Sequence, residues 1–171
     1  MPNRGSTDIN SLYDRKGLLD EVLGQFRLNK QGDHGPSHWS RVLHHARAIG
    51  EIAGANLLIV ELFAFLHDSQ RMDEYKDDLH GERAASYAAS LNGRFFELSA
   101  SDLDELTYAI RFHSEGQMHS NPTIQSCWDA DRLDLGRVGI RPSARFLSPV
   151  AAQRIERAYR WSRLGDESTA F

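Results

Sequence analysis

Imidazole and carboxylate groups lie at positions where apolar residues are expected. Asp131 follows Ile124 by seven residues, so at about 100° per residue it falls within the apolar stripe of its helix. A carboxylate buried there must be paired, neutralised or bound to a metal, because burying a bare charge is very costly. Histidines are placed in the same way on the apolar faces of other predicted helices. The whole set is His38, His67, Asp68, His80, His113 and Asp131.

Each of these residues has an ordinary structural interpretation when it is considered alone. A histidine on an apolar face is most often a hydrogen-bonded core residue, and Asp131 could pair with Arg132 or Arg41. Five helices that all direct an imidazole or a carboxylate inward indicate a shared cation. Nitrogen and oxygen ligands together suit a first-row ion: Zn, Mn, Fe, Co or Ni. The absence of a cysteine cluster argues against a structural zinc site.

The elements that must position this set are helices. Apolar residues recur at helical spacing, and no segment shows the sustained alternation of a β-strand. We predict helices over residues 9–28, 37–55, 57–68, 80–91, 102–113, 122–135 and 150–164. The third is apolar on nearly all sides, so we expect it at the centre of the fold. Ser101 is the predicted N-cap of the fifth, with Asp104 at the capping-box offset.

The predicted fold class is all-α, a bundle of six to eight helices around a central metal site. The 171 residues suit one domain, which we place at residues 9–164, between a flexible segment 1–8 and a C-terminal tail 165–171. No Pro/Gly/Ser-rich linker and no internal repeat divides it.

Composition excludes several classes of partner. With 20 Lys and Arg against 24 Asp and Glu, the net charge is −4, and no basic block indicates a nucleic-acid polymer or a membrane surface. The longest apolar run, residues 57–66, is too short to span a membrane. Because Cys127 is the single cysteine and the N-terminus lacks a secretory signal, we expect a cytoplasmic protein. The sequence leaves a homo-oligomer open.

Three motifs, taken in order, resemble the HD superfamily of metal-dependent phosphohydrolases, which is named for its His-Asp doublet. The segment His38-Trp-Ser-Arg-Val looks like the first motif of that family. The doublet His67-Asp68 closes an apolar helix, as it does in the family. The segment Asp-Ala-Asp-Arg-Leu-Asp at residues 129–134 looks like the last motif, which makes Asp131 the implied ligand. The resemblance spans residues 35–135 and implies an HD-type helical domain.

Two further histidines resemble the extra ligands of binuclear members of that superfamily. The context Ile-Arg-Phe-His113-Ser-x-Gly is closest to the HD-type diadenosine tetraphosphate hydrolases, and the Gly-Tyr-Pro segment of the cyclic-dinucleotide phosphodiesterases is missing. The resemblance implies that Asp68 bridges two ions. One ion would be held by His38, His67 and Asp131, and the other by His80 and His113. A mononuclear site, in which His80 and His113 bind substrate phosphate, stays open, and Mg is a further candidate metal.

The implied activity is hydrolysis of a nucleotide or another small phosphate ester by a metal-activated water. Asp68 and Arg71 are the predicted catalytic residues. Guanidinium groups match phosphate oxygens, so Arg71, Arg132 and Arg137 are the candidate phosphate ligands. Asp129 and Asp134 are expected to support the metal ligands from outside. The alternative is a nucleotide-sensing or regulatory module that keeps the metal site and turns over little.

The remaining polar features have ordinary interpretations. His34 and His119 fall in predicted loops and are expected to be exposed, whereas His45 is assigned to helix packing or to the surface. The acidic run at residues 73–78 reads as a solvated loop, with a lid over the site as the alternative. We expect Cys127 to be a packed apolar residue and not a nucleophile.

Overall fold

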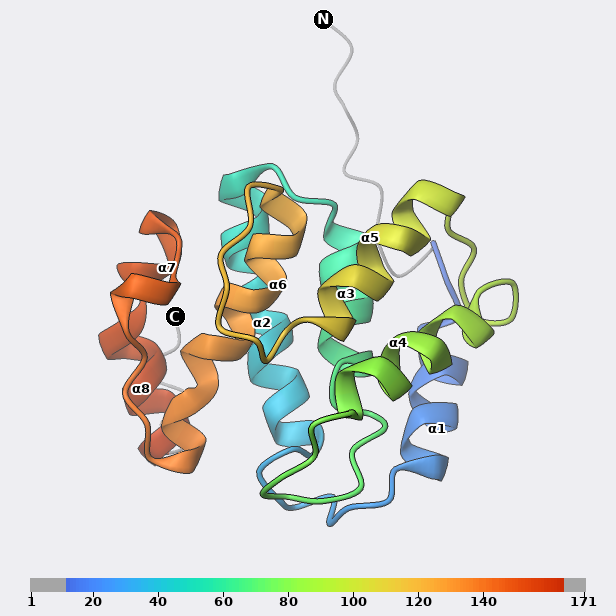
Figure 1. The fold of residues 1–171 in the computed structure, drawn as a ribbon, viewed down its shortest axis with the longest axis horizontal. Coiled ribbons are helices and arrows are strands. Elements are labelled where there is room, and N and C mark those ends of the chain that lie inside the picture. Colours follow the sequence, from blue (N-terminus) through green and yellow to red (C-terminus); the bar gives the residue numbers. More distant parts are fainter. Residues whose placement is uncertain (1–11, 165–171) are drawn as a thin grey trace, which may run out of the picture.

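The computed structural model describes residues 12–164, and this part of the chain is built from helices (Figure 1). The α-helices are α1 Arg15–Gln25, α2 Pro36–Ala53, α3 Leu57–Leu66, α4 His80–Leu91, α5 Ala100–Arg111, α6 Pro122–Leu133, α7 Pro149–Ala152 and α8 Ile155–Leu164. Two short 3-10 helices, η2 Asp134–Val138 and η3 Ala144–Phe146, follow α6. An isolated bridge between Asn92 and Phe96 is the only β pairing in the described range. The predicted all-α class is confirmed.

Helix α3 is the central element of the bundle. Every side chain from Ile59 to Leu66 is buried, which is what a helix apolar on all sides requires. Helices α1, α2, α4, α5 and α6 all contact it. The Asn56 side chain caps its N-terminus by accepting from the backbone N–H groups of Leu58 and Ile59. The His67-Asp68 doublet therefore directly follows the C-terminal end of a buried helix at the middle of the fold.

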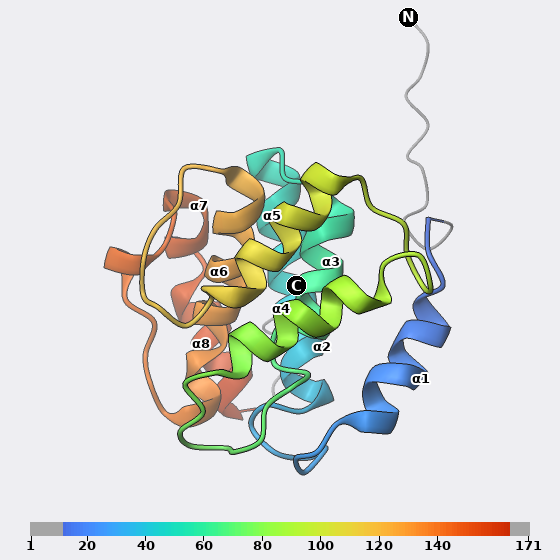
Figure 2. The same cartoon turned by 45° about the vertical axis from the view of Figure 1, so that its right-hand side comes forward.

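The outer helices lie on opposite sides of this centre. Helix α1 is on one side and α7 and α8 are on the other, in both views (Figure 1 and Figure 2). A second, smaller core holds α7 and α8 against α2 and α6. Its buried members are Ile49, Leu133, Leu147, Ala151 and Ala158. None of the helices in residues 12–164 combines the length and hydropathy that crossing a bilayer requires.

Gly81 lets α4 approach the end of α5 closely. A Cβ atom at this position would lie 2.5 Å from the carbonyl oxygen of Arg111, inside any normal contact distance. His80 precedes this glycine and His113 follows α5 by two residues. The close approach therefore brings the two histidines together.

Several predicted boundaries are wrong in detail. Helix α5 begins at Ala100, and Ser99 is its N-cap in place of Ser101, because the Ser99 side chain accepts from the Asp102 backbone N–H at 3.2 Å. The predicted helix at 150–164 is divided, since Ser148 and Pro149 start the short α7 and α8 begins separately at Ile155. The predicted segments 1–8 and 165–171 lie outside the described residues.

Candidate metal centre

Four histidines meet in two pairs at the buried end of α3. The Nε2 atoms of His38 and His67 are 3.0 Å apart, and those of His80 and His113 are also 3.0 Å apart. None of the four residues is more than 4% exposed. His38 comes from α2, His67 follows α3, His80 opens α4 and His113 follows α5. We refer to these as the His38–His67 pair and the His80–His113 pair.

The other nitrogen of each ring, Nδ1, is held by an oxygen. Carboxylate and carbonyl oxygens only accept, so each Nδ1 carries the hydrogen and the Nε2 lone pair faces the partner ring. Two facing lone pairs need a proton or a cation between them. The acceptors are Asp134 Oδ2 for His38 at 2.6 Å, the Phe63 carbonyl for His67 at 3.1 Å, the Asp77 carbonyl for His80 at 2.5 Å and the Ile110 carbonyl for His113 at 2.6 Å.

The Asp68 carboxylate lies between the two pairs. Its Oδ2 is 3.5 Å from His38 Nε2 and 3.6 Å from His67 Nε2. Its Oδ1 is 3.6 Å from His80 Nε2 and 3.5 Å from His113 Nε2. These separations are too long for good hydrogen bonds, but two ligands of one ion lie roughly 3 to 3.5 Å apart when each bond is about 2.1 Å. One carboxylate oxygen therefore faces each pair.

Asp131 adds a second carboxylate to the His38–His67 pair. Its Oδ1 lies 3.3 Å from His38 Nε2 and 3.7 Å from His67 Nε2. The arginine pairing that the sequence left open is not formed by Arg41, which donates to Asp134 at 2.6 and 3.0 Å. Ligand atoms in three overlapping groups lie within 4.8 Å of one another: His38, His67 and Asp68; His67, His113 and Asp131; and Asp68, His80 and His113. The six predicted ligands therefore converge on one place.

The electrostatics of the cluster favour bound positive charge. Burial alone would raise the pKa of Asp68, but His67 and the other surrounding imidazoles hold it well below the usual value. Burial lowers the pKa of His67 to about 3, so this ring is neutral. Burial and Arg137 oppose protonation of His38, yet hydrogen bonds with the neighbouring carboxylates raise its pKa to about 9. Without a bound ion, a proton on His38 Nε2 therefore lies between the two rings, in the place that a metal ion would take. The site keeps its carboxylates ionised and attracts a cation toward them.

His34 is a member of this buried cluster that the sequence interpretation missed. The prediction that it is exposed is wrong, because it is 6% exposed and its Nδ1 lies 2.8 Å from Asp68 Oδ2. The residue precedes the helix-starting Gly35-Pro36 step and stands four residues before His38. That spacing, which continues the buried face of α2 backwards, is the signal that would have found it.

Two of the three predicted phosphate-binding arginines lie beside the cluster with part of the guanidinium unused. Arg71 donates from Nε to Asp68 Oδ1 at 3.0 Å and from Nη1 to the Asp73 carbonyl at 3.2 Å. Arg137 donates from Nε to the Asp33 carbonyl at 2.8 Å and from Nη1 to the Asp134 carbonyl at 3.1 Å. Within residues 12–164, Nη2 of neither arginine makes a hydrogen bond. Both side chains line the cavity next to the cluster.

Arg132 is engaged differently from these two arginines. Its Nη1 donates to the Phe146 carbonyl at 2.8 Å and its Nη2 to the Gln117 carbonyl at 2.6 Å. The guanidinium therefore ties the loop before α6 to the segment around η3. Arg132 forms part of the cavity wall while both of its amino groups are bound to main-chain oxygens.

The two acidic residues that were expected to support the ligands have different surroundings. Asp134 accepts from His38 Nδ1 and from Arg41, so it contacts a member of the cluster directly. Asp129 is buried on another side of α6, where it accepts from the Gln125 side chain at 2.7 Å and from the Ser148 backbone at 3.1 Å. The structure brings Asp134 to the site and leaves Asp129 in the packing of α6 against the start of α7.

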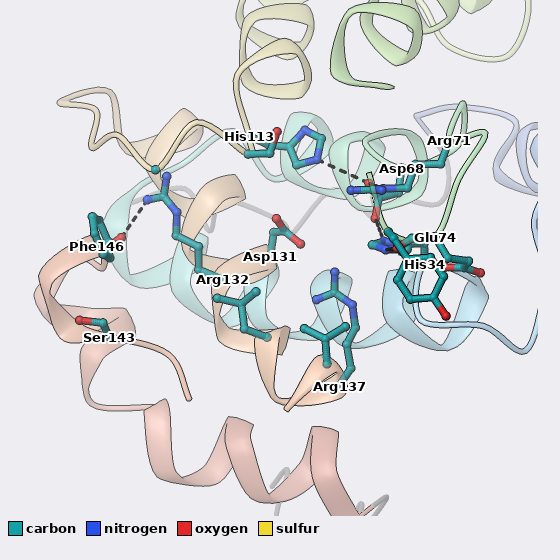
Figure 3. Close-up of a pocket in the computed structure, with 15 residues that line it drawn as sticks. His34, Asp68, Arg71, Glu74, His113, Asp131, Arg132, Arg137, Ser143 and Phe146 are labelled. Atoms are coloured by element: carbon teal, nitrogen blue, oxygen red, sulfur yellow. Dashed lines mark hydrogen bonds and ion pairs between the residues drawn. The ribbon is translucent and has the colours of Figure 1, made fainter. Parts of the chain in front are cut away.

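A cavity of about 500 Å³ opens onto the cluster (Figure 3). Asp68, His113 and Asp131 point toward its centre, with His34, Glu74 and Arg71 on one side and Phe146, Ser143 and Arg132 on the other. Leu135, Val138 and Phe146 make part of the wall apolar. Glu74, from the acidic run at 73–78, lines the cavity, so this run is not simply solvated. The volume suits a small-molecule ligand.

The Cys127 thiol is not part of this cavity. It is fully buried in the apolar core, and burial raises its pKa well above the usual value. A thiol in that environment does not ionise readily and is a poor nucleophile.

The comparisons with known proteins bear on the fold. No protein-family model matches the chain, and no curated protein sequence matches it. The fold is similar to a crystal structure from an uncultured Thermotogales bacterium that is described as a predicted HD superfamily hydrolase. The TM-score is 0.68 at 24% sequence identity, over 95% of this chain and 97% of that chain. The resemblance predicted from the sequence motifs is thereby confirmed at the level of the fold, which is that of an HD-type helical domain.

Proposed function

We propose that this protein is a metal-dependent phosphohydrolase that acts on a nucleotide or another small phosphate ester. The observation that carries the proposal is the Asp68 carboxylate, with one oxygen facing each of two histidine pairs whose Nε2 lone pairs converge. The HD-type fold of a protein described as a predicted hydrolase is in keeping with it.

The donor set fits two first-row divalent ions. The His38–His67 pair, Asp131 and Asp68 Oδ2 would hold one, and the His80–His113 pair and Asp68 Oδ1 would hold the other. Four imidazole nitrogens favour a transition metal such as Mn, Fe, Co, Ni or Zn over Mg, which prefers oxygen ligands. When bound, such ions lower the pKa of a coordinated water and neutralise the charge of phosphoryl oxygens.

The chain's own residues would orient the substrate. Arg71 and Arg137 lie on different sides of the cavity, and their Nη2 groups are available for phosphate oxygens (Figure 3). Because Nε and Nη1 of each arginine are already fixed, little side-chain entropy is lost when phosphate binds. The apolar side chains of Leu135, Val138 and Phe146 line part of the cavity and would contact the organic part of the ester.

Hydrolysis assays on metal-loaded protein test the proposal. Protein stripped of metal and reloaded with Mn, Fe, Co, Ni or Zn should hydrolyse at least one member of a panel of nucleotides, diadenosine tetraphosphate and p-nitrophenyl phosphate. Activity should disappear with a chelator and in Asp68→Asn, whereas the matched variant Asp129→Asn should keep it. Tight metal binding without hydrolysis of any phosphate ester would contradict the proposal and favour the sensing module.

A further inference from the structure

His34 contacts the Asp68 carboxylate on the oxygen that faces the His38–His67 pair. We propose that His34 is a positioning residue, which fixes the plane of this carboxylate so that its two oxygens face different ions. The inference rests on the proposed function, because it concerns the metal centre that the function requires.

The Asp68 carboxylate is held from its two ends. His34 Nδ1 donates to Oδ2 at 2.8 Å, and Arg71 Nε donates to Oδ1 at 3.0 Å. Among residues 12–164, these are the only side chains within hydrogen-bond geometry of it, since the four cluster imidazoles lie at 3.5 to 3.6 Å. With one donor on each oxygen, rotation of the carboxylate about its Cβ–Cγ bond would break both bonds. His34 and Arg71 therefore set the bridging orientation together.

His34 is itself rigidly placed. Its backbone carbonyl accepts from the Trp39 indole N–H at 2.8 Å, and its Nε2 lies 3.2 Å from the carbonyl oxygen of Glu74. The next residue, Gly35, packs so closely on the preceding turn that a Cβ atom there would lie 2.4 Å from the Lys30 carbonyl oxygen. A ring held in this way loses little entropy when it orients a partner, which is what a supporting residue of a metal site requires.

The geometry also separates His34 from the ligands. Its Nδ1 is directed at a carboxylate oxygen at hydrogen-bond distance, and its Nε2 is directed at a backbone carbonyl. Neither nitrogen therefore presents a lone pair to the cluster. The contact with Glu74 adds a second role, because it joins the carboxylate to the loop that lines the cavity.

Three substitutions at His34 distinguish positioning from other roles. Asparagine places an amide N–H where Nδ1 lies, glutamine places one where Nε2 lies, and alanine removes both. Binding of Mn²⁺ or Zn²⁺ to the full chain would be measured by competition with a chromophoric chelator, with circular dichroism and thermal unfolding to establish folding. His119→Ala is the matched control, since His119 is the other loop histidine and its Nδ1 accepts from the Asn121 backbone.

We expect His34→Ala and His34→Gln to lower the binding affinity for one of the two ions by about 10- to 100-fold. His34→Asn should bind both ions nearly as wild type does, and His119→Ala should be unaffected. Equal affinity in wild type and His34→Ala would overturn this inference alone. Loss of that ion from all three variants even at saturating metal would make His34 a ligand and also overturn it. Failure of the wild type to bind any ion would contradict the proposed function and this inference with it.

Discussion

His38 and His45 lie two turns apart on α2, and their surroundings give them opposite protonation behaviour. Neighbouring carboxylates raise the pKa of His38 to about 9. Burial lowers the pKa of His45 to about 3. Both His45 nitrogens lack a hydrogen-bond partner within residues 12–164, and the ring packs edge-on against Trp161 with centroids 5.4 Å apart. His45 therefore serves in helix packing, in agreement with the interpretation from sequence.

Acid should destabilise the protein through His45. The folded pKa lies below the ordinary value of 6.5, so between about pH 6.5 and 3 the unfolded chain binds the extra proton. The free energy of unfolding then falls by up to about 1.4 kcal/mol for each unit of pH decrease, and this contribution is constant above that window.

We predict that His45→Phe, which keeps the packing on Trp161, removes this dependence and shows a shallower loss of stability below pH 6.5. Urea unfolding of metal-free wild type and variant at pH 7.5, 6 and 5 measures it. Parallel pH profiles for the two proteins would refute the assignment.

Asp134 and Asp129 form a natural pair for testing support of the ligands. Because Asp134 accepts from His38 Nδ1, Asp134→Asn should weaken binding of one ion by about 10- to 100-fold. Asp129→Asn should bind metal normally. The substitution should also cost little folding free energy, because burial already raises the pKa of the Asp129 carboxyl and its Oδ2 has no hydrogen-bond partner in the described structure. Metal titration of the two folded variants measures the difference, and equal effects would show that the distinction is wrong.

At the scale of elements, the contact between α4 and the end of α5 sets the spacing of the His80–His113 pair. A Cβ at Gly81 would lie 2.5 Å from one carbonyl oxygen and 3.1 Å from another. Gly81→Ala should therefore push the helices apart, costing about 1–3 kcal/mol of stability. The same substitution should weaken the binding of the ion at the His80–His113 pair.

Gly24→Ala is the control for that substitution. Gly24 lies within α1 with no atom within 4 Å of an added Cβ, so alanine there should stabilise by about 0.5–1 kcal/mol and leave metal binding unchanged. Thermal unfolding and metal titration measure both variants. A Gly81→Ala protein that is as stable and binds metal as well as wild type would contradict the close-approach argument.

The sequence predicted the elements whose signals are local. Helix α4 begins and ends where periodicity placed it, and α3 is central because its apolar residues surround its axis. The six predicted metal ligands converge because the apolar face of each helix, on which they lie, packs toward the centre of the bundle. Tertiary contacts determine the placement of the residues that the sequence did not predict. His34 is buried because a loop folds back over Asp68, and Arg132 is bound by two carbonyls from segments distant in sequence. The two carbonyl contacts of Arg132 leave no periodic pattern in the chain, and the only trace of His34 is its four-residue spacing from His38.

Across the whole molecule, the cluster is where α2, α3, α4, α5 and α6 meet. Ligand candidates separated by as many as 93 residues, from His38 to Asp131, lie within a few ångströms of one another. Buried ionised carboxylates facing histidine lone pairs are costly unless a cation compensates them. A bound ion should therefore contribute to the stability of the bundle as well as to chemistry.

Anomalous diffraction from crystals of the Mn-loaded or Zn-loaded protein tests the central claim most directly. Data collected at the absorption edge of the ion should show two peaks, one at the His38–His67 pair beside Asp131 and one at the His80–His113 pair, with Asp68 between them. A single peak at the His38–His67 pair would contradict the two-ion centre, and the absence of any peak at either pair in metal-loaded protein would contradict the metal site itself.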